Sequence, residues 1–456
     1  MTDTAVDLVV LGGGSAGYAC AMRAAELGSS VVLIERDKLG GTCLHRGCVP
    51  TKALLHAAEV ADEVKEAAAV GLKATFDGVD IQGLHSYKDS IVAKHFKGLT
   101  GLVASRGVTV VAGDGTFVGP RSVKVGDDTY TGTNVVLATG SYSRSLAGLA
   151  IEGRVITSEQ ALELEWVPRT ALVLGGGVIG VEFASVWASL GADVTIIEAM
   201  PSLVPNEDPW VAKQLERAFK KRKINFKTGV RFSGVTQDDN GVTVTLESGD
   251  TLSADLLLVA VGRGPATEGT GFAEAGVQMD RGFVLTNERL ATNLPNVYAV
   301  GDIVPGLQLA HRGFQQGIFV AEEIAGLAPI VVPDHKVPRI TYCDPQIASV
   351  GPTEEQAKQQ HGEVETLTYN TAGNAKTDIL RTAGGIKVVR VKDGPVVGFH
   401  MVGGRIGELI GEAQLIVDWE AFPEDVAPYV HGHPTQYEAI GETMLAMAGK
   451  PLHVHS

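Results

Sequence analysis

Short apolar runs that end in glycine-rich turns set the pattern of the first part of the chain. Residues 6–11 form a mostly apolar run that ends in the turn Gly12–Gly17 (GGGSAG). Residues 18–27 are rich in alanine and predict a helix, and a second β-rich run at residues 30–34 ends at Glu35. The order is therefore strand, glycine turn, helix and strand, with an acid about twenty residues after the first glycine.

This order predicts a dinucleotide-binding fold. Glycine lets the backbone approach a pyrophosphate closely, the N-terminus of the helix favours its negative charge, and the acid accepts hydrogen bonds from ribose hydroxyls. A glycine turn alone is a weak signal, but here both strands and the acid accompany it. The candidate nucleotide contacts are Gly12, Gly14, Ser15, Gly17 and Glu35.

The same pattern repeats later in the chain. Residues 170–174 lead into the turn Gly175–Gly180 (GGGVIG), a helix is predicted over residues 181–190, and the strand at residues 192–197 ends at Glu198. The chain therefore carries two predicted dinucleotide sites.

The residues after Glu198 indicate which nucleotide the second site prefers. No arginine appears between Glu198 and Arg217. A carboxylate suits the free 2′-hydroxyl of NAD and repels the 2′-phosphate of NADP, so this site is predicted to prefer NAD. The alternative is that Glu198 is only a solvated strand end.

Further glycine turns mark where the chain passes between domains. Apolar strands end at Gly140 and again at Gly262, on either side of the second site. The first domain then resumes, because residues 296–300 form a predicted strand that ends at Gly301 and Asp302. Asp302 could hydrogen-bond a cofactor hydroxyl, or it could cap the following helix.

From Val331 the pattern changes. Several prolines interrupt the first part of this segment. Residues 385–390 and 396–400 are predicted as antiparallel strands, and residues 406–419 as a helix. The predicted fold class is α/β, with two Rossmann-like dinucleotide-binding domains, one inserted in the other, and a C-terminal α+β domain. The predicted boundaries are 1–152 and 267–332 for the first domain, 153–266 for the inserted domain and 333–456 for the C-terminal domain.

Composition narrows the possible partners. Among 456 residues, 38 Lys and Arg face 53 Asp and Glu, and the net charge of −15 is spread without long single-sign blocks. Nucleic acid and anionic membranes both call for clustered basic residues, so neither is predicted as a partner. No apolar run approaches the roughly 18 residues that span a bilayer. Four cysteines in all, and a start with two aspartates and no basic residue, predict a cytoplasmic protein.

Cys43 and Cys48 are the candidates for redox chemistry. Five residues of ideal helix would separate their Cα atoms by roughly 7.5 Å, beyond the roughly 7 Å that a disulfide spans. Gly47 admits unusual backbone angles and Pro50 disfavours helical geometry at Val49, so a kink is predicted that brings the sulfurs together. Alternatives are two unrelated thiols or half of a zinc site. The other two cysteines are single and distant, and no metal site is predicted.

Two histidines and a glutamate gather near the C-terminus. His433 precedes Pro434, and Glu438 follows five residues after His433. Histidine suits proton transfer near neutral pH, and a carboxylate on its far nitrogen fixes the tautomer and raises the basicity. His433 is therefore predicted as an acid/base with Glu438 as its partner, and His431 is the weaker candidate.

With these motifs in this order, the chain resembles the flavoprotein disulfide reductases with two dinucleotide-binding domains (class I pyridine nucleotide-disulfide oxidoreductases), most closely their dihydrolipoamide dehydrogenase branch. The resemblance covers essentially the whole chain. The motifs that carry it are the turn Gly12–Gly17, Gly40–Lys52 with the cysteine pair, Ala138-Thr139-Gly140, Gly175–Gly180 with Glu182, Gly262-Arg263 with Pro265, Gly301-Asp302, and His433-Pro434-Thr435 with Glu438.

The resemblance implies tightly but non-covalently bound FAD in the first site, NAD in the second, and a homodimer formed by the C-terminal domain. It implies that the substrate is a lipoyl group on a 2-oxo acid dehydrogenase complex or on a glycine-cleavage carrier protein. The implied FAD contacts are Gly12, Gly14, Ser15, Gly17, Glu35, Gly41, Thr42, Lys52, Gly115, Thr139, Gly140, Gly301, Asp302 and Ala310, and the implied NAD contacts are Gly175, Gly177, Ile179, Gly180, Glu198 and Gly262.

By the same resemblance, His433 and Glu438 complete the active site of the other subunit and take a proton from the dithiol. The substrate thiolate then attacks Cys43, and Cys48 passes electrons through FAD to NAD. Lys52 follows Cys48 by four residues, on the same side of a helix that begins there. The resemblance pairs Lys52 with Glu182, whereas the alternative for Lys52 is a solvated surface lysine.

Departures from the family pattern are few. Asp344-Pro345-Gln346 stands where the family often has Pro-Glu, and Gly432 stands where alanine is frequent. Glutathione reductase prefers NADPH through arginines that this chain lacks just after Glu198, and mercuric reductase carries an extra C-terminal cysteine pair that residues 449–456 lack. Two alternatives stay open: a related reductase of another small disulfide, and a flavin-containing binding subunit of a multienzyme complex.

Overall fold

The first glycine turn follows β1, a central strand of a mixed sheet. The computed structural model describes residues 3–453. In it, α1 (Ser15–Glu26) connects β1 (Asp3–Leu11) to the parallel strand β2 (Val31–Glu35), and α1 begins earlier than predicted because Gly14 already occupies its N-cap position. The strands of this sheet are, in order, β3 (Thr109–Ala112), β2, β1, β6 (Asp128–Leu137), β5 (Ser122–Val125) and β4 (Gly115–Gly119), with β19 (Val297–Ala299) also paired to β6.

Close packing against this turn explains its glycines. An added Cβ on Gly17 would lie 1.8 Å from the carbonyl oxygen of Gly12, and one on Gly12 would lie 2.3 Å from the carbonyl oxygen of Ala138. Gly12 also has a φ of +108°, which side chains with a Cβ rarely adopt. The turn therefore brings the N-terminus of α1 directly against the ends of β1 and β6.

The second glycine turn lies in an all-parallel sheet and repeats this packing. An added Cβ on Gly180 would lie 1.9 Å from the carbonyl oxygen of Gly175. Helix α6 (Val178–Ser189) is therefore seated on its sheet in the same way as α1. The strands are, in order, β11 (Asn225–Lys227), β10 (Asp193–Ile197), β9 (Thr170–Leu174), β15 (Leu256–Val259) and β8 (Val155–Thr157).

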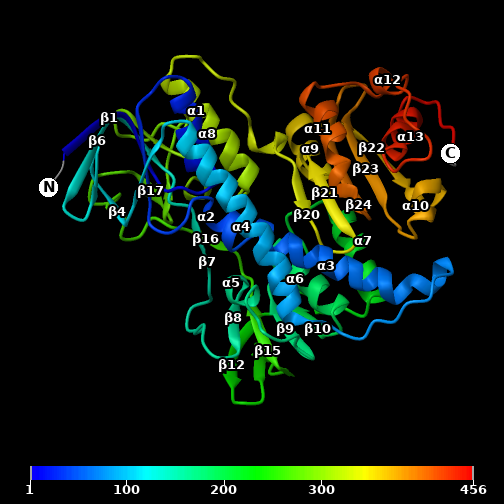
Figure 1. The fold of residues 1–456 in the computed structure, drawn as a ribbon. Helices are drawn as coiled ribbons and strands as arrows, with labels where there is room; N and C mark the ends of the chain where they lie inside the picture. The colour runs from blue at the N-terminus through cyan, green and yellow to red at the C-terminus, as the bar shows by residue number, and fades with distance from the viewer. Residues whose placement is uncertain (1–2, 454–456) are drawn as a thin grey trace.

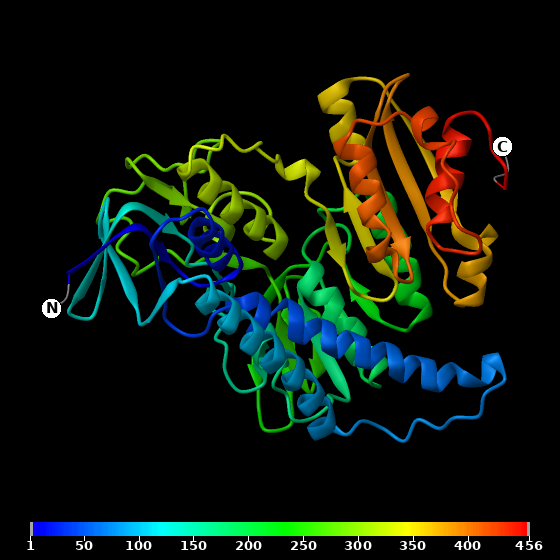
Figure 2. The same cartoon turned by 45° about the horizontal axis from the view of Figure 1, so that its top comes forward.

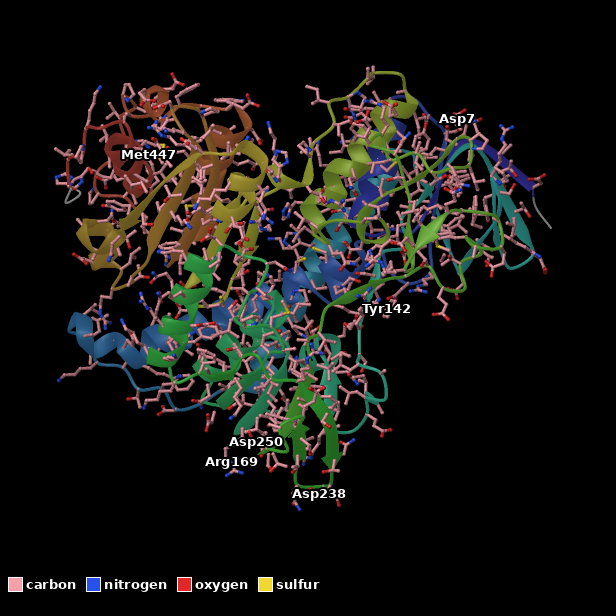
Figure 3. All side chains as sticks on the ribbon, turned by 180° about the vertical axis from the view of Figure 1, so that it is seen from behind. Asp7, Tyr142, Arg169, Asp238, Asp250 and Met447 are labelled. Atoms are coloured by element: carbon pink, nitrogen blue, oxygen red, sulfur yellow. The ribbon has the colours of Figure 1, made fainter. Side chains whose placement is uncertain are left out.

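The chain passes between the two sheets along one pair of short strands. β7 (Ser141–Ser143) runs antiparallel to β16 (Arg263–Pro265). Tyr142 of β7, labelled in Figure 3, lies where the two lobes join. After this crossing the chain returns to the first sheet, where β19 pairs with β6. The second nucleotide-binding unit is therefore inserted in the first.

The C-terminal lobe is built on an antiparallel sheet. Helices α11 (Ile410–Asp418) and α13 (Glu438–Met447) cover one of its faces, and Phe399 and Met401 lie in the core between them. The predicted helix over residues 406–419 is instead a short 3₁₀ turn, η5 (Ile406–Glu408), followed by α11. The strands are, in order, β20 (Arg339–Thr341), β21 (Gln346–Val350), β24 (Val396–Gly403), β23 (Gly385–Val391) and β22 (Val364–Asn370).

The other face of this sheet packs on the inserted lobe. Lys387 of β23 donates two hydrogen bonds, of 2.9 and 3.0 Å, to Asp208, the N-cap residue of α7 (Pro209–Lys221). Two nucleotide-binding lobes and a C-terminal α+β lobe are all present (Figure 1), so the predicted fold class is confirmed.

Two long helices lie between the lobes, α3 (Cys48–Glu66) and α4 (Ile81–Ser105) (Figure 2). Helix α3 packs along α6 of the inserted lobe. On α4, the buried Lys88 donates a 2.9 Å hydrogen bond to the carbonyl oxygen of Leu162 in that lobe. Helix α3 therefore carries its first residues to the place where both nucleotide-binding lobes meet.

No helix within residues 3–453 is long and apolar enough to cross a membrane. The remaining elements are α2 (Gly41–His45), η1 (Ala67–Val70), α5 (Ser158–Ala161), β12 (Phe232–Gln237), β13 (Val242–Leu246), β14 (Thr251–Ala254), β17 (Met279–Asp280), β18 (Phe283–Val284), η2 (Gly301–Ile303), α8 (Ala310–Ile324), η3 (Asp334–Lys336), α9 (Glu354–His361), η4 (Thr371–Gly373), α10 (Ala375–Ile379) and α12 (Pro423–Val426).

Candidate active site

A cavity of about 690 Å³ lies where the two nucleotide-binding lobes meet. Its walls come from the start of α1, from α2 and α3, from the start of α6, and from η2 and the start of α8. These elements are far apart in the sequence, and their joint contribution identifies the cavity as the candidate active site. The predicted site residues that line it are Gly14, Ser15, Thr42, Cys43, Cys48, Lys52, Gly140, Ile179, Glu182, Gly301, Asp302 and Ala310.

Other predicted site residues lie outside this lining. Most belong to the glycine turns and strand ends. These positions contact the pyrophosphate and ribose of a dinucleotide, which lie at a distance from its reacting ring. The residues outside the lining are Gly12, Gly17, Glu35, Gly41, Gly115, Thr139, Gly175, Gly177, Gly180, Glu198, Gly262, His433 and Glu438.

The cysteine pair sits at a break between two helices. Helix α2 ends before Arg46 and α3 begins at Cys48, so the chain turns at Gly47. An added Cβ on Gly47 would lie 3.0 Å from the carbonyl oxygen of Thr42, which makes glycine the residue that fits there. The predicted effect of Pro50 is wrong. Val49 and Pro50 both lie in the first turn of α3, where the missing N–H of proline has no helical partner to lose.

The two thiols are hydrogen-bonded to each other and differ in acidity. Both cysteines are free thiols in this structure. The pKa of Cys48 is lowered to about 7, chiefly by the hydrogen bond from Cys43 and also by the nearby Lys52 ammonium, against the opposing effect of burial. The pKa of Cys43 is raised, because Cys43 donates to the Cys48 sulfur and is itself buried. Cys48 is therefore the thiolate of the reduced pair.

Lys52 is held by a buried carboxylate. Its Nζ lies 2.9 Å from both carboxylate oxygens of Glu182, a residue with only 3% of its surface exposed. The backbone N–H of Tyr342 donates to Glu182 Oε1 at 2.9 Å, and Nζ lies 4.8 Å from the centre of the Tyr342 ring. Burial alone would lower the pKa of Lys52, but Glu182 outweighs it and the pKa is raised. Lys52 is thus not a solvated surface lysine.

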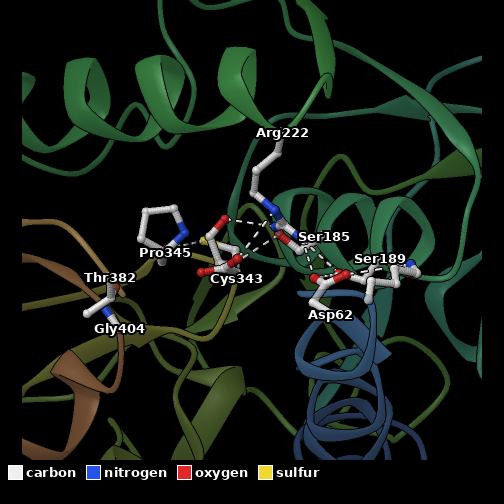
Figure 4. Close-up of polar contacts among 10 residues, drawn as sticks. Asp62, Ser185, Ser189, Arg222, Cys343, Pro345, Thr382 and Gly404 are labelled. Atoms are coloured by element: carbon white, nitrogen blue, oxygen red, sulfur yellow. Dashed lines mark hydrogen bonds and ion pairs between the residues drawn. The ribbon is translucent and has the colours of Figure 1, made fainter. Parts of the chain in front are cut away.

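A second polar cluster lies further along α3 and α6, the helices that carry Lys52 and Glu182. Arg222 Nη2 donates to Asp62 of α3 at 3.0 Å and to Ser189 of α6 at 2.7 Å, and its Nε lies 3.3 Å from a carboxylate oxygen of Asp344 (Figure 4). Asp344 N in turn donates to Ser185 of α6 at 3.1 Å. Arg222 therefore joins α3, α6 and the segment after β20, which fixes α6 and its Glu182 against α3.

The acids that follow the two glycine turns have matching geometry. Glu35 accepts hydrogen bonds from Gly13 N at 2.6 Å and from the backbone N–H of Asp37 at 2.8 Å. Glu198 accepts from Gly176 N at 2.6 Å and from Met200 N at 2.7 Å, and it is buried. A solvated strand end would not show these bonds, so that alternative for Glu198 is wrong.

The glycine turns fit a dinucleotide. Gly14 and Gly177 are the N-cap residues of α1 and α6, neither makes a side-chain cap, and an added Cβ on either would meet no atom within 4 Å. Both helix N-termini therefore keep backbone N–H groups open to an anion. In the first lobe, Thr139 Oγ1 is buried without a partner among the described residues, as expected of a hydroxyl that bonds a ligand.

A polar cluster at the crossing strands was missed by the sequence analysis. Ser141 Oγ donates to Asp302 at 2.5 Å, and Arg263 Nε donates to Ser141 Oγ at 2.8 Å. All three residues line the cavity, as does Tyr342. Asp302 does not cap α8, which begins at Ala310, so the capping alternative is wrong. The sequence signal was slight: two serines just after Gly140, and the arginine of the Gly262-Arg263 motif.

His433 and Glu438 are paired but stand apart from the cavity. His433 Nδ1 lies 2.8 Å from Glu438 Oε1, and Thr435 N donates to the other carboxylate oxygen at 2.5 Å. A carboxylate on Nδ1 leaves Nε2 as the basic nitrogen. The His433 side chain is 74% exposed, and neither residue lines the cavity of its own chain. One chain therefore does not bring His433 to Cys43.

A hydrogen-bonded thiol pair, a lysine held by a buried carboxylate and two glycine turns around one cavity define a flavin-dependent disulfide oxidoreductase that uses a pyridine nucleotide. Residues 6–317 match the family described as pyridine nucleotide-disulphide oxidoreductase, and residues 337–444 match its dimerisation domain. This chain belongs to that family. It is an oxidoreductase that uses FAD and NAD, and its dimerisation domain supports a homodimer.

Individual relatives match over most of their length. The mitochondrial dihydrolipoyl dehydrogenase of Pisum sativum is 38% identical over 464 residues, covering 98% of this chain and 92% of the pea protein. A dihydrolipoyl dehydrogenase of Bacillus subtilis (strain 168) is 36% identical over 471 residues and covers 99% of each chain. Among solved structures, LpdA from Mycobacterium tuberculosis superposes with a TM-score of 0.90 at 27% identity, covering 97% of this chain and 99% of that one.

Proposed function

We propose that this protein oxidises protein-bound dihydrolipoamide to lipoamide and passes two electrons through the Cys43–Cys48 pair and FAD to NAD⁺, which yields NADH. The observation that carries the proposal is the Cys48 thiol of lowered pKa beside Lys52, in a cavity lined from both nucleotide-binding lobes. Relatives named dihydrolipoyl dehydrogenase match the chain from end to end, which supports the lipoyl substrate.

The dithiol half of the reaction begins with His433 as the base. His433, oriented by Glu438, takes a proton from one substrate thiol, because the thiolate is the form that attacks a disulfide. The substrate thiolate attacks Cys43 of the oxidised pair, the Cys43–Cys48 bond breaks, and Cys48 leaves as a thiolate. The second substrate thiol then attacks the substrate sulfur bonded to Cys43, Cys43 leaves and takes up the proton of that thiol, and the substrate closes its own disulfide. The cysteine pair thereby gains the two electrons that the substrate loses.

The remaining residues prepare the other half of the reaction. FAD, when bound, supplies the two-electron carrier between the reduced cysteine pair and NAD⁺. Lys52 favours negative charge at Cys48 and in the adjoining cavity, and Glu182 keeps its ammonium in place. The two acids Glu35 and Glu198 would hold ribose hydroxyls of FAD and NAD, since each carboxylate retains lone pairs beyond its backbone bonds.

The proposal includes an active site shared between two subunits. Val430, beside the His433 loop, has 97% of its surface exposed in one chain, which a partner subunit would cover. The proposed domains are residues 1–152 together with 267–332, the inserted domain 153–266, and the C-terminal domain 333–456. Two elements support these boundaries: β8 begins just after residue 153, and η3 begins just after residue 333. A lipoyl domain of a 2-oxo acid dehydrogenase complex or a glycine-cleavage carrier protein is the proposed partner, and the cytoplasm the proposed location.

An anaerobic visible spectrum of the purified dimer tests this function. Added dihydrolipoamide should produce the long-wavelength band that a Cys48 thiolate gives beside an oxidised flavin, and NAD⁺ added afterwards should abolish it as NADH forms. In Cys48→Ser the band should be absent. Flavin reduction by dihydrolipoamide at the wild-type rate in this variant would contradict the cysteine relay.

A related reductase of another small disulfide gives a different result in the same experiment. Dihydrolipoamide would leave the spectrum unchanged, while NADH would still generate the band, because the cysteine pair accepts electrons from either side. That outcome would keep the flavin and disulfide chemistry and overturn the lipoyl substrate.

A further inference from the structure

A second histidine–carboxylate pair lies two residues from the proposed base. His431 Nε2 is 2.8 Å from Glu412 Oε1 on α11, and the His431 side chain is only 10% exposed. His433, by contrast, points into solvent in the isolated chain. The two histidines therefore face in different directions: His431 toward the body of the C-terminal lobe and His433 away from it.

His431 lies in the loop between α12 and α13, and its ring packs against α11 and α13. Its ring centroid lies 5.4 Å from that of Tyr437, and an added Cβ on Gly441 of α13 would lie 2.5 Å from His431 Nδ1. Glu412 holds the same ring from α11. The imidazole thus connects α11, α13 and the loop between α12 and α13, and a side chain at Gly441 would force the His431 ring to shift.

Hydrogen bonds carry this anchoring to His433. Tyr437, which contacts the His431 ring, accepts a 2.8 Å hydrogen bond from Gly432 N through its hydroxyl oxygen. Thr435 Oγ1 donates to the carbonyl oxygen of Gly432 at 2.6 Å, and Thr435 N donates to Glu438. Gly432, on one side of His433, is therefore held by Tyr437, which packs on His431. Thr435, on the other side, is held by Gly432.

We propose that His431, held by Glu412, is a positioning residue that fixes the loop on which His433 acts as the base. This inference rests on the proposed function, because it takes His433 as the proton acceptor of the dithiol reaction. His431 itself touches neither the cavity nor the cysteine pair in its own chain.

The charged and polar groups around His431 predict how the activity of the enzyme depends on pH. Glu412 on α11, the Tyr429 carbonyl, the Tyr437 hydroxyl and Glu438 on α13 surround the ring. Chiefly through the hydrogen bond to Glu412, the pKa of His431 is raised. A raised pKa means that the ion pair is intact at lower pH and is lost as the pH rises through the folded-state pKa. Activity should therefore decline on the alkaline side as the loop loses this contact.

Two variants of the full-length dimeric holoenzyme test the proposal. In His431→Gln, turnover with dihydrolipoamide and NAD⁺ should fall about tenfold to a hundredfold, the scale expected when a catalytic group is displaced by about 1 Å, and the alkaline decline should disappear. In Glu412→Gln, the ion pair cannot form at any pH, so turnover should fall toward that of His431→Gln and the alkaline decline should disappear as well. NADH oxidation by an artificial electron acceptor does not require His433 and should stay within twofold of wild type.

His453→Gln is the matched control. His453 Nδ1 lies 2.8 Å from Glu442 Oε1, so this pair has the same contact distance but lies at the C-terminal tail. Both activities and the pH profile should stay unchanged in this variant. An equal loss of turnover and of NADH oxidation in His431→Gln would overturn the proposal, because it would show general damage to the enzyme.

His433→Gln separates this inference from the function on which it rests. If His433→Gln loses at least a hundredfold in turnover while His431→Gln stays within twofold of wild type, the positioning role is wrong and the base remains. If His433→Gln loses less than about tenfold, His433 is not the base, and the inference fails together with that part of the proposed function.

Discussion

The two thiols of the active site differ because of what surrounds each sulfur. Cys48 receives the hydrogen bond and lies near the Lys52 ammonium, whereas Cys43 donates the hydrogen bond. These contacts lower the pKa of Cys48 and raise that of Cys43, so Cys48 is the more acidic thiol of the two. The protein surroundings therefore give the two thiols different roles. Cys43 is available for exchange with a substrate, and Cys48 carries the negative charge of the thiolate.

Lys52→Met should raise the pKa of Cys48. A cation favours the thiolate, so its loss should move the midpoint of the titration upward by about one unit or more. The pH dependence of the long-wavelength thiolate band in the two-electron-reduced enzyme measures this midpoint. Lys65→Met on the same helix is the control, since Lys65 bonds to the Ser189 carbonyl and lies away from the cysteines. An unchanged midpoint in Lys52→Met would show that the ammonium does not act on Cys48.

Residue contacts over long sequence distances limit what the sequence could predict. The cysteines, the base and its glutamate are short-range motifs, and each was recognisable from spacing. Tyr342, in contrast, reaches Glu182 across 160 positions, and Arg222 reaches Asp62 across the same separation. Neither tyrosine nor arginine has a spacing rule that reveals such a partner, so both contacts became visible only in the folded chain.

At the scale of elements, the two glycine turns allow packing and binding to be tested separately. Gly180→Ala places a Cβ 1.9 Å from the Gly175 carbonyl oxygen, and the resulting overpacking should cost about 1–3 kcal/mol in the free energy of unfolding. Gly177→Ala meets no protein atom, so stability should stay within about 0.5 kcal/mol. NADH affinity should nevertheless fall, because the methyl group would stand in front of the α6 N-terminus.

Urea unfolding and NADH titration of both variants measure these effects. Equal stability losses in Gly177→Ala and Gly180→Ala would contradict the packing explanation. Unchanged NADH binding in Gly177→Ala would show that the nucleotide does not approach this turn.

Helix boundaries show where local rules were insufficient. The rule that a residue before proline avoids helical angles predicted a kink at Val49, but the first turn of α3 accommodates Pro50 and the break lies at Gly47. The predicted helix at residues 406–419 is divided after Glu408, and it follows Arg405, which has a φ of +57°. Tertiary packing therefore decided where both helices begin.

At the scale of the whole molecule, a buried ion pair joins the inserted lobe to the C-terminal lobe. Asp208 is fully buried, and it accepts bonds from Lys387 and from the backbone of Trp210 and Glu354. Burial would raise the pKa of Asp208, but these donors outweigh it and the pKa is lowered. Its contribution to stability is therefore present above the unfolded pKa of about 3.9, and it is lost as the pH falls through the lower folded value.

Lys387→Met should destabilise the fold by about 3–5 kcal/mol, because it leaves the Asp208 carboxylate buried without its cation. The double variant with Asp208→Asn should recover much of this loss. Lys358→Met, which removes an exposed partner of Glu354, should change stability by less than about 0.5 kcal/mol. Urea denaturation measures all three, and equal effects of Lys387→Met and Lys358→Met would contradict a role for the buried pair.

Mixed dimers test whether the active site is shared. Cys48→Ser and His433→Gln should each be inactive as homodimers in the dihydrolipoamide reaction. In a mixed dimer, one site would carry both defects and the other neither, so random reassociation should restore about a quarter of wild-type activity. No recovery, with mixed dimers shown to be present, would place both residues in sites of a single chain.

The paired strands β7 and β16 have a consequence for the history of the chain. Because the chain enters and leaves the inserted lobe along adjacent antiparallel strands, the two ends of that lobe lie side by side. A segment with neighbouring ends can be added to an existing gene within a single surface loop. The host sheet then loses no strand, since β19 still finds its place beside β6. The matching Gly13–Glu35 and Gly176–Glu198 contacts show that the inserted lobe has the same turn geometry as its host.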